Sequence, residues 1–212
     1  MLILYGSRGS GSAAVELALQ RCSTPYRVVR ASTWEADSAR DELHRVNPLG
    51  QIPTLQLEDG TVLTESAAIL IHLGLTHAES GLLPADASAR AQAIRGLVFI
   101  AANCYAAIGV IDYPERWCGA GDGAVHDHIR AAARARLHGY WDIFADQFGG
   151  DASAPFLGGA QPGALDFLAA VVSRWGGARA HLGGTRPALR ATFERVQAHP
   201  AAAPVFAAHW PG

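Results

Sequence analysis

NPLGQIPTL, at residues 47–55, and LTESAAI, at residues 63–69, are the two stretches that decide how this chain folds. Pro53 lacks a backbone N–H and holds its own φ fixed, so it belongs at the edge of a sheet and not within its ladder. It also pushes Ile52 toward an extended conformation. An extended residue at a sheet edge leaves its N–H and C=O free to pair with the backbone of a peptide. The first stretch therefore predicts an edge that is open to a peptide-like ligand.

Glu65 and Ser66 open the helix that the second stretch predicts. The unpaired N–H groups and the positive end of the dipole at a helix start favour a carboxylate. Ser66 offers this carboxylate a hydroxyl, and Glu65 offers an acceptor to an ammonium group. A short peptide-like ligand with an amine and carboxylates fits these groups.

Residues 1–78 read as a domain that mixes strands and helices. Asp59-Gly60 lies between two short apolar runs and predicts a hairpin. The predicted strands are 2–5, 26–29, 54–57 and 62–64, and the predicted helices are 12–22, 40–46 and 65–75. This order predicts an α/β domain in which helices pack on a mixed sheet.

Residues 87–212 read as an all-α domain that follows a linker at 80–84. No convincing strand appears there, and Ala and Arg, both good helix formers, dominate. Pro114 is expected to kink or end the first helix nearby. The predicted helices are 87 to about 117, 125–148, 164 to about 174, and 188–199.

Composition excludes several classes of protein. Hydrophobic residues make up 50% and charged residues 17% of the 212 residues, which is typical of a folded globular protein. The net charge of −2 provides no basic surface for nucleic acid. No apolar run of about 18 residues and no signal peptide are recognised, so we expect neither a membrane span nor a membrane partner. The 3 Cys residues are widely spaced and fit no disulfide framework, which indicates a reducing cytoplasm.

The two opening stretches, with LYGSRGS at residues 4–10 and PGALDF at 162–167, closely resemble the glutathione transferase family over nearly the whole chain. The resemblance implies a thioredoxin-like domain at 1–78, an all-helical domain at 87–212 and a homodimer. It implies glutathione as co-substrate and a small hydrophobic electrophile as second substrate. One position departs from the family pattern: Gly163 stands where Ser or Thr is usual.

The same resemblance assigns the glutathione site residue by residue. Gln51, Ile52, Pro53, Glu65 and Ser66 match the family's binding positions. In the family the proline is cis, and the residue before it pairs with the cysteinyl unit of glutathione. Gln51 replaces a common lysine, so it keeps hydrogen-bonding capacity but loses a charge.

The loop at residues 7–12 lies between the first strand and the first helix, where a thiolate gains from donors and from the helix dipole. By resemblance Ser10 matches the sulfur-binding serine, and Ser12 is the second candidate. Gly11 falls where bacterial beta-class enzymes place a cysteine. Tyr5 lies one position along the sequence from where the tyrosine-type classes keep their tyrosine, so it is not assigned that role. On the residues alone, a tight turn that caps a helix is the favoured reading of this loop, and the resemblance shifts it toward Ser10.

Two tyrosines are candidates for the second-substrate pocket. The resemblance places the helix that carries Tyr105 and Tyr113 along the ligand cleft, and aromatic side chains with a polar tip suit a mixed pocket. Ordinary helix packing is the alternative for each. Asp166 is read as a folding device, because its carboxylate can reach back to the N–H groups at the helix start.

Three functions remain open at this point. The first is a glutathione transferase, the second a glutathione-dependent disulfide reductase or peroxidase, and the third a non-catalytic glutathione-binding or regulatory protein. No metal is predicted, because His126 and His128 lie two residues apart and point to different sides of a helix. The loop at 6–11 lacks the Gly-Lys-Ser/Thr of a phosphate-binding loop.

Overall fold

The computed structural model describes residues 1–32, 34–119, 122–149 and 154–211. Its four strands form one mixed sheet in the order β2-β1-β3-β4. Strand β1 runs parallel to β2 and antiparallel to β3, and β4 closes an antiparallel hairpin with β3. The strands are β1 (Leu2–Gly6), β2 (Tyr26–Arg30), β3 (Thr54–Gln56) and β4 (Val62–Leu63). All four predicted strands are confirmed, and Asp59 accepts a hydrogen bond from the Thr61 N–H in the predicted hairpin turn.

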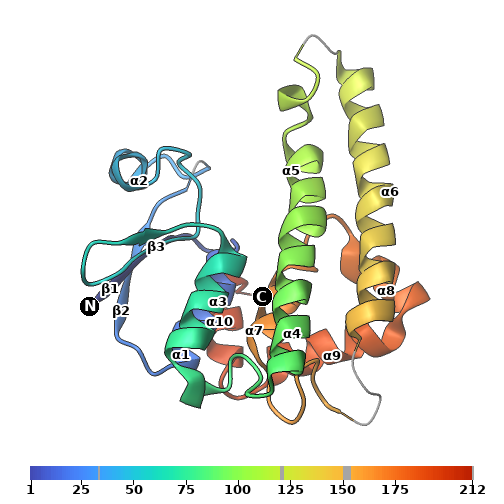
Figure 1. The fold of residues 1–212 in the computed structure, drawn as a ribbon. Helices are drawn as coiled ribbons and strands as arrows, with labels where there is room; N and C mark the ends of the chain where they lie inside the picture. The colour runs from blue at the N-terminus through green and yellow to red at the C-terminus, as the bar shows by residue number, and fades with distance from the viewer. Residues whose placement is uncertain (33, 120–121, 150–153, 212) are drawn as a thin grey trace.

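Helices cover both faces of this sheet (Figure 1). Helices α1 (Ser12–Arg21) and α3 (Ser66–Thr76) pack side by side against one face, and α2 (Arg40–Val46) lies on the other. Leu43 of α2 joins a small buried cluster with Tyr5 and Ala31. The Tyr5 hydroxyl donates to Glu42 at 2.9 Å, so this tyrosine is engaged with α2. The arrangement is the mixed α/β domain that the sequence predicted and the thioredoxin-like fold that the resemblance implied.

In the second half, the regular elements among the residues that the structure describes are all helices, and Phe156 and Gly159 form an isolated β-bridge. A 3₁₀ turn, η1 (Ala78–Ser80), leads into this half. The first long helical run is α4 (Ala87–Phe99), a π-helical segment η2 (Ile100–Tyr105) and α5 (Ala106–Asp112), which ends before the short η3 (Pro114–Arg116) as Pro114 predicted. The others are α6 (Gly123–Phe148), α7 (Ala164–Val172), α8 (Ala178–Thr185), α9 (Pro187–Ala198) and α10 (Ala203–His209). Helices α8 and α10 were not predicted.

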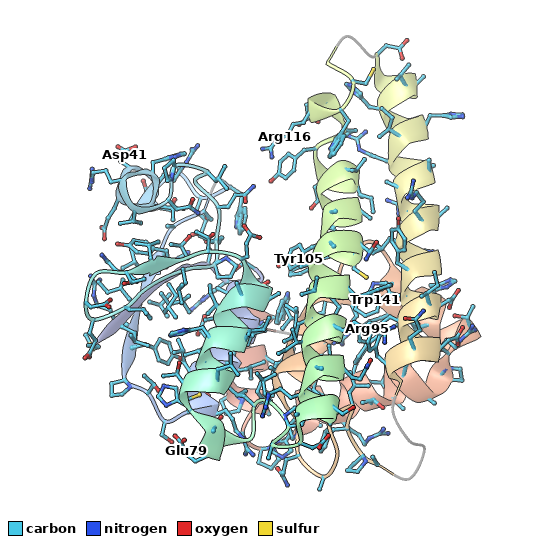
Figure 2. The ribbon with its side chains drawn as sticks, in the orientation of Figure 1. Asp41, Glu79, Arg95, Tyr105, Arg116 and Trp141 are labelled. Atoms are coloured by element: carbon cyan, nitrogen blue, oxygen red, sulfur yellow. The ribbon has the colours of Figure 1, made fainter. Side chains whose placement is uncertain are left out.

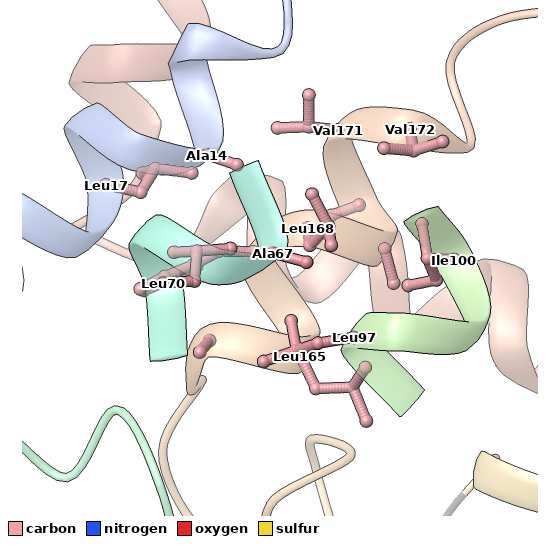
Figure 3. Packing of buried hydrophobic residues seen from close by; sticks show 14 of the residues in the cluster. Ala14, Leu17, Ala67, Leu70, Leu97, Ile100, Leu165, Leu168, Val171 and Val172 are labelled. Atoms are coloured by element: carbon pink, nitrogen blue, oxygen red, sulfur yellow. The ribbon is translucent and has the colours of Figure 1, made fainter. Parts of the chain in front are cut away.

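Helix α7 lies at the centre of the molecule and joins the two halves. All nine of its residues are buried, as expected for a helix that is apolar on every side. It packs against α1, α3 and α4, and Figure 3 shows Leu165 and Leu168 between Leu70 and Leu97. The two halves therefore share one hydrophobic core, which holds their relative position.

Asp166 stabilises the start of this buried helix. Its two carboxylate oxygens accept from the backbone N–H of Leu157 at 2.8 Å and of Gly163 at 3.0 Å. Burial raises the pKa of Asp166 to about 6, and the backbone donors oppose that rise. The predicted folding role of Asp166 is confirmed, and Gly163 has no side chain with which to reciprocate.

One long apolar segment bears on the expectation that the chain has no membrane span. The helical run Ala87–Asp112 has 26 residues and contains an 18-residue window with a mean hydropathy of 1.8, so by length and composition it is apolar enough to cross a membrane. A third of that window is buried inside the protein, where it packs on α6 and α7. The core helix of a folded domain has these same properties.

Candidate functional site

A cleft of about 840 Å³ lies between the α/β half and the long helical run α4–η2–α5. Four segments that are distant in the sequence line it: the loop before α1, the segment before β3, the start of α3, and the helical run. Its size falls within the range of small-ligand sites. The predicted residues that line it are Ser10, Gln51, Ile52, Pro53, Glu65, Ser66, Tyr105 and Tyr113.

Asn47 holds the segment before β3 in shape. Its side-chain amide donates to the Gln51 carbonyl and to the Thr54 hydroxyl, both at 3.0 Å. Gly50 has a φ of +61°, and a Cβ there would lie 2.3 Å from the His44 ring. Only glycine satisfies both conditions.

The Ile52–Pro53 peptide bond is cis, as the resemblance implied. In the part of the chain that the structure describes, neither backbone polar group of Ile52 has a protein hydrogen-bond partner. Pro53 is buried, whereas Gln51 is exposed at the mouth of the cleft. The backbone of Ile52 is thus available to a ligand in an extended conformation.

Glu65 and Ser66 lie at the amino terminus of α3, which has 11 residues. Glu65 has φ 63° and ψ 110°, a backbone conformation that non-glycine residues rarely adopt. Strain of this kind gathers at ligand-binding sites. The Ser66 hydroxyl is buried at the cleft wall, while the Glu65 side chain is exposed. The helix dipole and the Ser66 hydroxyl favour an anion here, and Glu65 supplies a negative charge beside it.

The two candidate serines occupy different positions. Ser10 lines the cleft, whereas Ser12 is fully buried behind it, against Gly6. The Ser10 hydroxyl lies 2.7 Å from the Ser7 carbonyl oxygen, to which it donates, and 2.9 Å from the Ser12 hydroxyl. It also accepts from the Ser12 N–H at 3.2 Å. Ser12 therefore contacts Ser10 and is shielded from a ligand in the cleft.

The two candidate tyrosines lie at different depths of the cleft. Figure 2 shows Tyr105 extending from the long helical run toward the α/β half. Its ring lies 5.9 Å from that of Trp175, at a tilt of 43°. Tyr113 lies nearer the end of the run, and the Arg116 guanidinium stacks 3.9 Å above its ring. The cleft therefore offers aromatic surfaces and one cation beside the predicted glutathione positions.

Sequence reasoning missed three contributors to the cleft. Trp175 follows the buried helix α7, and no pattern in the sequence connects it with Tyr105. Trp34 lines the opposite wall and is 57% exposed. Asn47 was quoted only as part of a motif, although an Asn beside a proline often marks a hydrogen-bonded turn. Its signal was present in the sequence.

Comparisons with known proteins find relatives over part of the chain. Residues 12–76 match the family model described as "Glutathione S-transferase, N-terminal domain". The chain is 40% identical over 119 residues to the uncharacterized GST-like protein YncG of Escherichia coli (strain K12), covering 55% of this chain and 57% of that protein. It is 36% identical over 118 residues to maleylacetoacetate isomerase of Rhizobium meliloti (strain 1021), covering 55% and 54%.

A solved structure resembles nearly the whole chain. A glutathione transferase homolog from sulfitobacter with bound glutathione superposes with a TM-score of 0.83 at 25% identity, covering 97% of this chain and 96% of that one. The sequence matches, by contrast, span only about half the length of the curated relatives.

Proposed function

We propose that this protein, whose residues 12–76 match the family model of the glutathione S-transferase N-terminal domain, binds glutathione in the cleft and activates its thiol for attack on an electrophile. The observation that carries the proposal is the meeting of Ile52, Glu65, Ser66 and Ser10 on one cleft. These four residues come from three separate segments and suit different parts of one short peptide.

Each part of glutathione has a chemically matched group. The backbone of Ile52 pairs with the cysteinyl unit, because an unpaired extended residue binds extended peptide. The start of α3 and the Ser66 hydroxyl bind the carboxylate of the γ-glutamyl unit, and Glu65 accepts from its ammonium group. Gln51 at the mouth binds the glycyl end, and Pro53 forms the apolar floor.

Ser10 is the proposed donor to the sulfur from the amino-terminal domain. When its hydroxyl turns from the Ser7 carbonyl toward the ligand, Ser12 can still donate to Ser10 at 2.9 Å. A hydroxyl that favours thiolate over thiol lowers the pKa of the bound thiol. The thiolate then attacks the electrophilic carbon, a C–S bond forms, and the leaving group departs with the electron pair of its broken bond. Holding both reactants in one cleft supplies much of the rate gain.

Ser10→Ala is expected to raise the pKa of bound glutathione and to lower turnover at neutral pH, with a smaller effect on affinity. The hydroxyl acts on the charged sulfur, whereas the rest of the peptide is bound elsewhere. Ser12→Ala should have a weaker effect. Thiolate absorbance followed against pH measures the pKa of bound glutathione. A raised pKa in Ser12→Ala, with an unchanged pKa in Ser10→Ala, would reverse the assignment of the two serines.

A glutathione-dependent isomerase is the second candidate function. One relative that shares half its length with this chain is named maleylacetoacetate isomerase. Reversible addition of the same thiolate to a double bond would use the same residues and would release no leaving group. Disulfide reduction, peroxide reduction and non-catalytic binding are further alternatives on this fold, because fold alone does not decide a reaction.

We expect glutathione to raise the melting temperature of the protein. A ligand that binds only the native state stabilises it by roughly 2.7 kcal/mol at a concentration 100 times its Kd. Thermal unfolding with and without millimolar glutathione measures the shift, and an unchanged melting temperature would contradict the proposed site.

Assays with an aryl halide, maleylacetoacetate and a disulfide, run in parallel, then separate the reactions. Binding with no turnover of any of them favours a binding protein.

Tyr113 and the outer cleft are the proposed site of the second substrate. Arg116 on the Tyr113 ring and the exposed Trp34 offer a planar, partly apolar surface to it.

We also propose a cytoplasmic homodimer. Cys22, Cys104 and Cys118 are free thiols, and Val98 on α4 is 51% exposed. The mass in solution, compared with 22.3 kDa for one chain, tests the dimer, and cell fractionation tests the compartment.

A further inference from the structure

The space above Gly11 is filled by a hydroxyl from the other half of the protein. A Cβ atom on Gly11 would lie 1.9 Å from the Tyr105 hydroxyl oxygen. Gly11 has φ −63° and ψ −13°, a helical conformation that any residue adopts, so its backbone does not call for glycine. Glycine is required at this position because the Tyr105 hydroxyl approaches it so closely. Residues 11 and 105 are therefore coupled across the cleft.

This contact lies where the proposed function places the sulfur. The same Cβ position is 3.6 Å from Cδ of Pro53, whose neighbour Ile52 would pair with the cysteinyl unit. Gly11 immediately precedes α1, so the positive end of that helix faces the same point. Ser10 lines the cleft beside it.

Tyr105 is held in place through its ring and not through its hydroxyl. The ring packs against Trp175 at 5.9 Å, and Tyr105 is the last residue of the π-helical segment Ile100–Tyr105. A π-helical turn is wider than an α-helical one and changes the direction of the side chains that follow, which is why such turns gather at functional sites. Among the described residues, the Tyr105 hydroxyl has no hydrogen-bond partner in the protein. A half-buried tyrosine usually has one.

We propose that Tyr105 is a catalytic residue that donates a hydrogen bond to the sulfur of glutathione, from the opposite side of the cleft to Ser10. The inference rests on the proposed glutathione site and adds a donor from the helical half. Ring packing fixes the position of the hydroxyl, so little conformational entropy is lost when it meets the ligand.

Tyr105 acts as a donor and not as a base. Burial raises the pKa of the Tyr105 hydroxyl above its ordinary value, and the negative charge of Glu65 adds to the rise. The hydroxyl therefore keeps its own proton at neutral pH. The thiol proton passes to water, and the resulting thiolate accepts the hydrogen bond from Tyr105 until the sulfur forms its new bond.

Tyr105→Phe keeps the ring and its contact with Trp175 and removes only the hydroxyl. We expect the pKa of bound glutathione to rise by about one, which is a tenfold lower thiolate fraction at a pH below both values. Glutathione affinity at a pH where the thiol is protonated should change less than threefold. Tyr140→Phe is the matched control, because its hydroxyl bonds Arg136 outside the cleft and its loss should leave this pKa unchanged.

Gly11→Ala provides an independent test through the coupling. Its Cβ must displace the Tyr105 hydroxyl, so this variant should raise the same pKa as much as Tyr105→Phe does. In the Tyr105→Phe background the nearest atoms are the ring carbon at 3.2 Å and Cδ of Pro53 at 3.6 Å, both at distances where a small shift suffices, so adding Gly11→Ala should raise the pKa little further. Non-additivity of this kind identifies residues that act through one contact.

The outcomes separate the two levels of the proposal. A parent protein that does not bind glutathione overturns the proposed function and this inference with it. Binding with an unshifted thiol pKa in the parent overturns hydroxyl activation. Binding with a lowered pKa that Tyr105→Phe leaves in place overturns the role of Tyr105 alone. A raised pKa in Tyr105→Phe and in Gly11→Ala, with non-additivity in the double variant, supports it.

Discussion

Glu65→Ala is expected to weaken glutathione binding about tenfold or more. A hydrogen bond to a charged group typically contributes about 1.5–3 kcal/mol, and about 1.4 kcal/mol is one factor of ten in Kd. Glu65 lies at the start of α3 beside the buried Ser66, where the γ-glutamyl end of the ligand is proposed to bind. Titration calorimetry of glutathione into the variant and the parent measures the change, and Ser66→Ala should show a loss of similar size.

Glu65→Gly separates the carboxylate from the backbone. Glutamate at φ 63° carries strain of order 1–3 kcal/mol, which glycine relieves, whereas alanine keeps it. Glycine also increases the conformational entropy of the unfolded chain, which offsets roughly 0.4–1 kcal/mol of that gain in stability. Both variants should lose glutathione affinity equally, and the glycine variant should melt at the higher temperature without ligand. If both bind glutathione as the parent does, Glu65 serves only the start of the helix.

Asp166→Ala is expected to lower the free energy of unfolding by roughly 2–6 kcal/mol, because it leaves one buried and one part-buried backbone N–H group without a partner at about 1–3 kcal/mol each. These are the N–H groups of Leu157 and Gly163, which the carboxylate binds at 2.8 and 3.0 Å. Asp166 is fully buried in α7, at the centre of the shared core. Urea unfolding of the variant and the parent at pH 7 measures the difference.

Asp86→Ala is the matched control for this prediction. Asp86 accepts from the Ala89 N–H at 2.8 Å as the N-cap of α4, but it is exposed. Its loss should cost about 0.5–2 kcal/mol, since water can replace the lost bond. If both variants lose the same free energy of unfolding, the burial of Asp166 does not increase the stabilisation that its hydrogen bonds provide.

Local rules were sufficient for much of the first half. The helix predicted at 40–46 has the bounds Arg40–Val46 in the structure, because Asn47-Pro48 stops it through the restriction that proline places on the preceding residue. The hairpin at Asp59-Gly60 and the end of the long helical run ahead of Pro114 were predicted in the same way. These signals act over a few residues, so they are legible in the sequence.

Local rules failed where packing outweighs propensity. Helix α8 contains Gly183 and Gly184, which disfavour a helix, and α10 has only seven residues. Both are held by tertiary contacts: α8 packs on α6 and α9, and α10 packs on α1 and α9. The π-helical segment at Ile100–Tyr105 also had no signal that we recognised in the sequence.

The sequence by itself indicated two segments of the candidate site, because the proline at 53 and the Glu65-Ser66 pair each have a local physical meaning, and the family resemblance added the loop at 7–12 and the helix that carries Tyr105. Only the tertiary structure decided how their side chains meet. It turned Ser10 to the cleft and buried Ser12 behind it, and it placed Trp175 against the Tyr105 ring. It also brought the Tyr105 hydroxyl over Gly11, 94 positions earlier in the chain. The direction of a side chain depends on the elements packed around it, and no pattern of spacing along one segment contains that information.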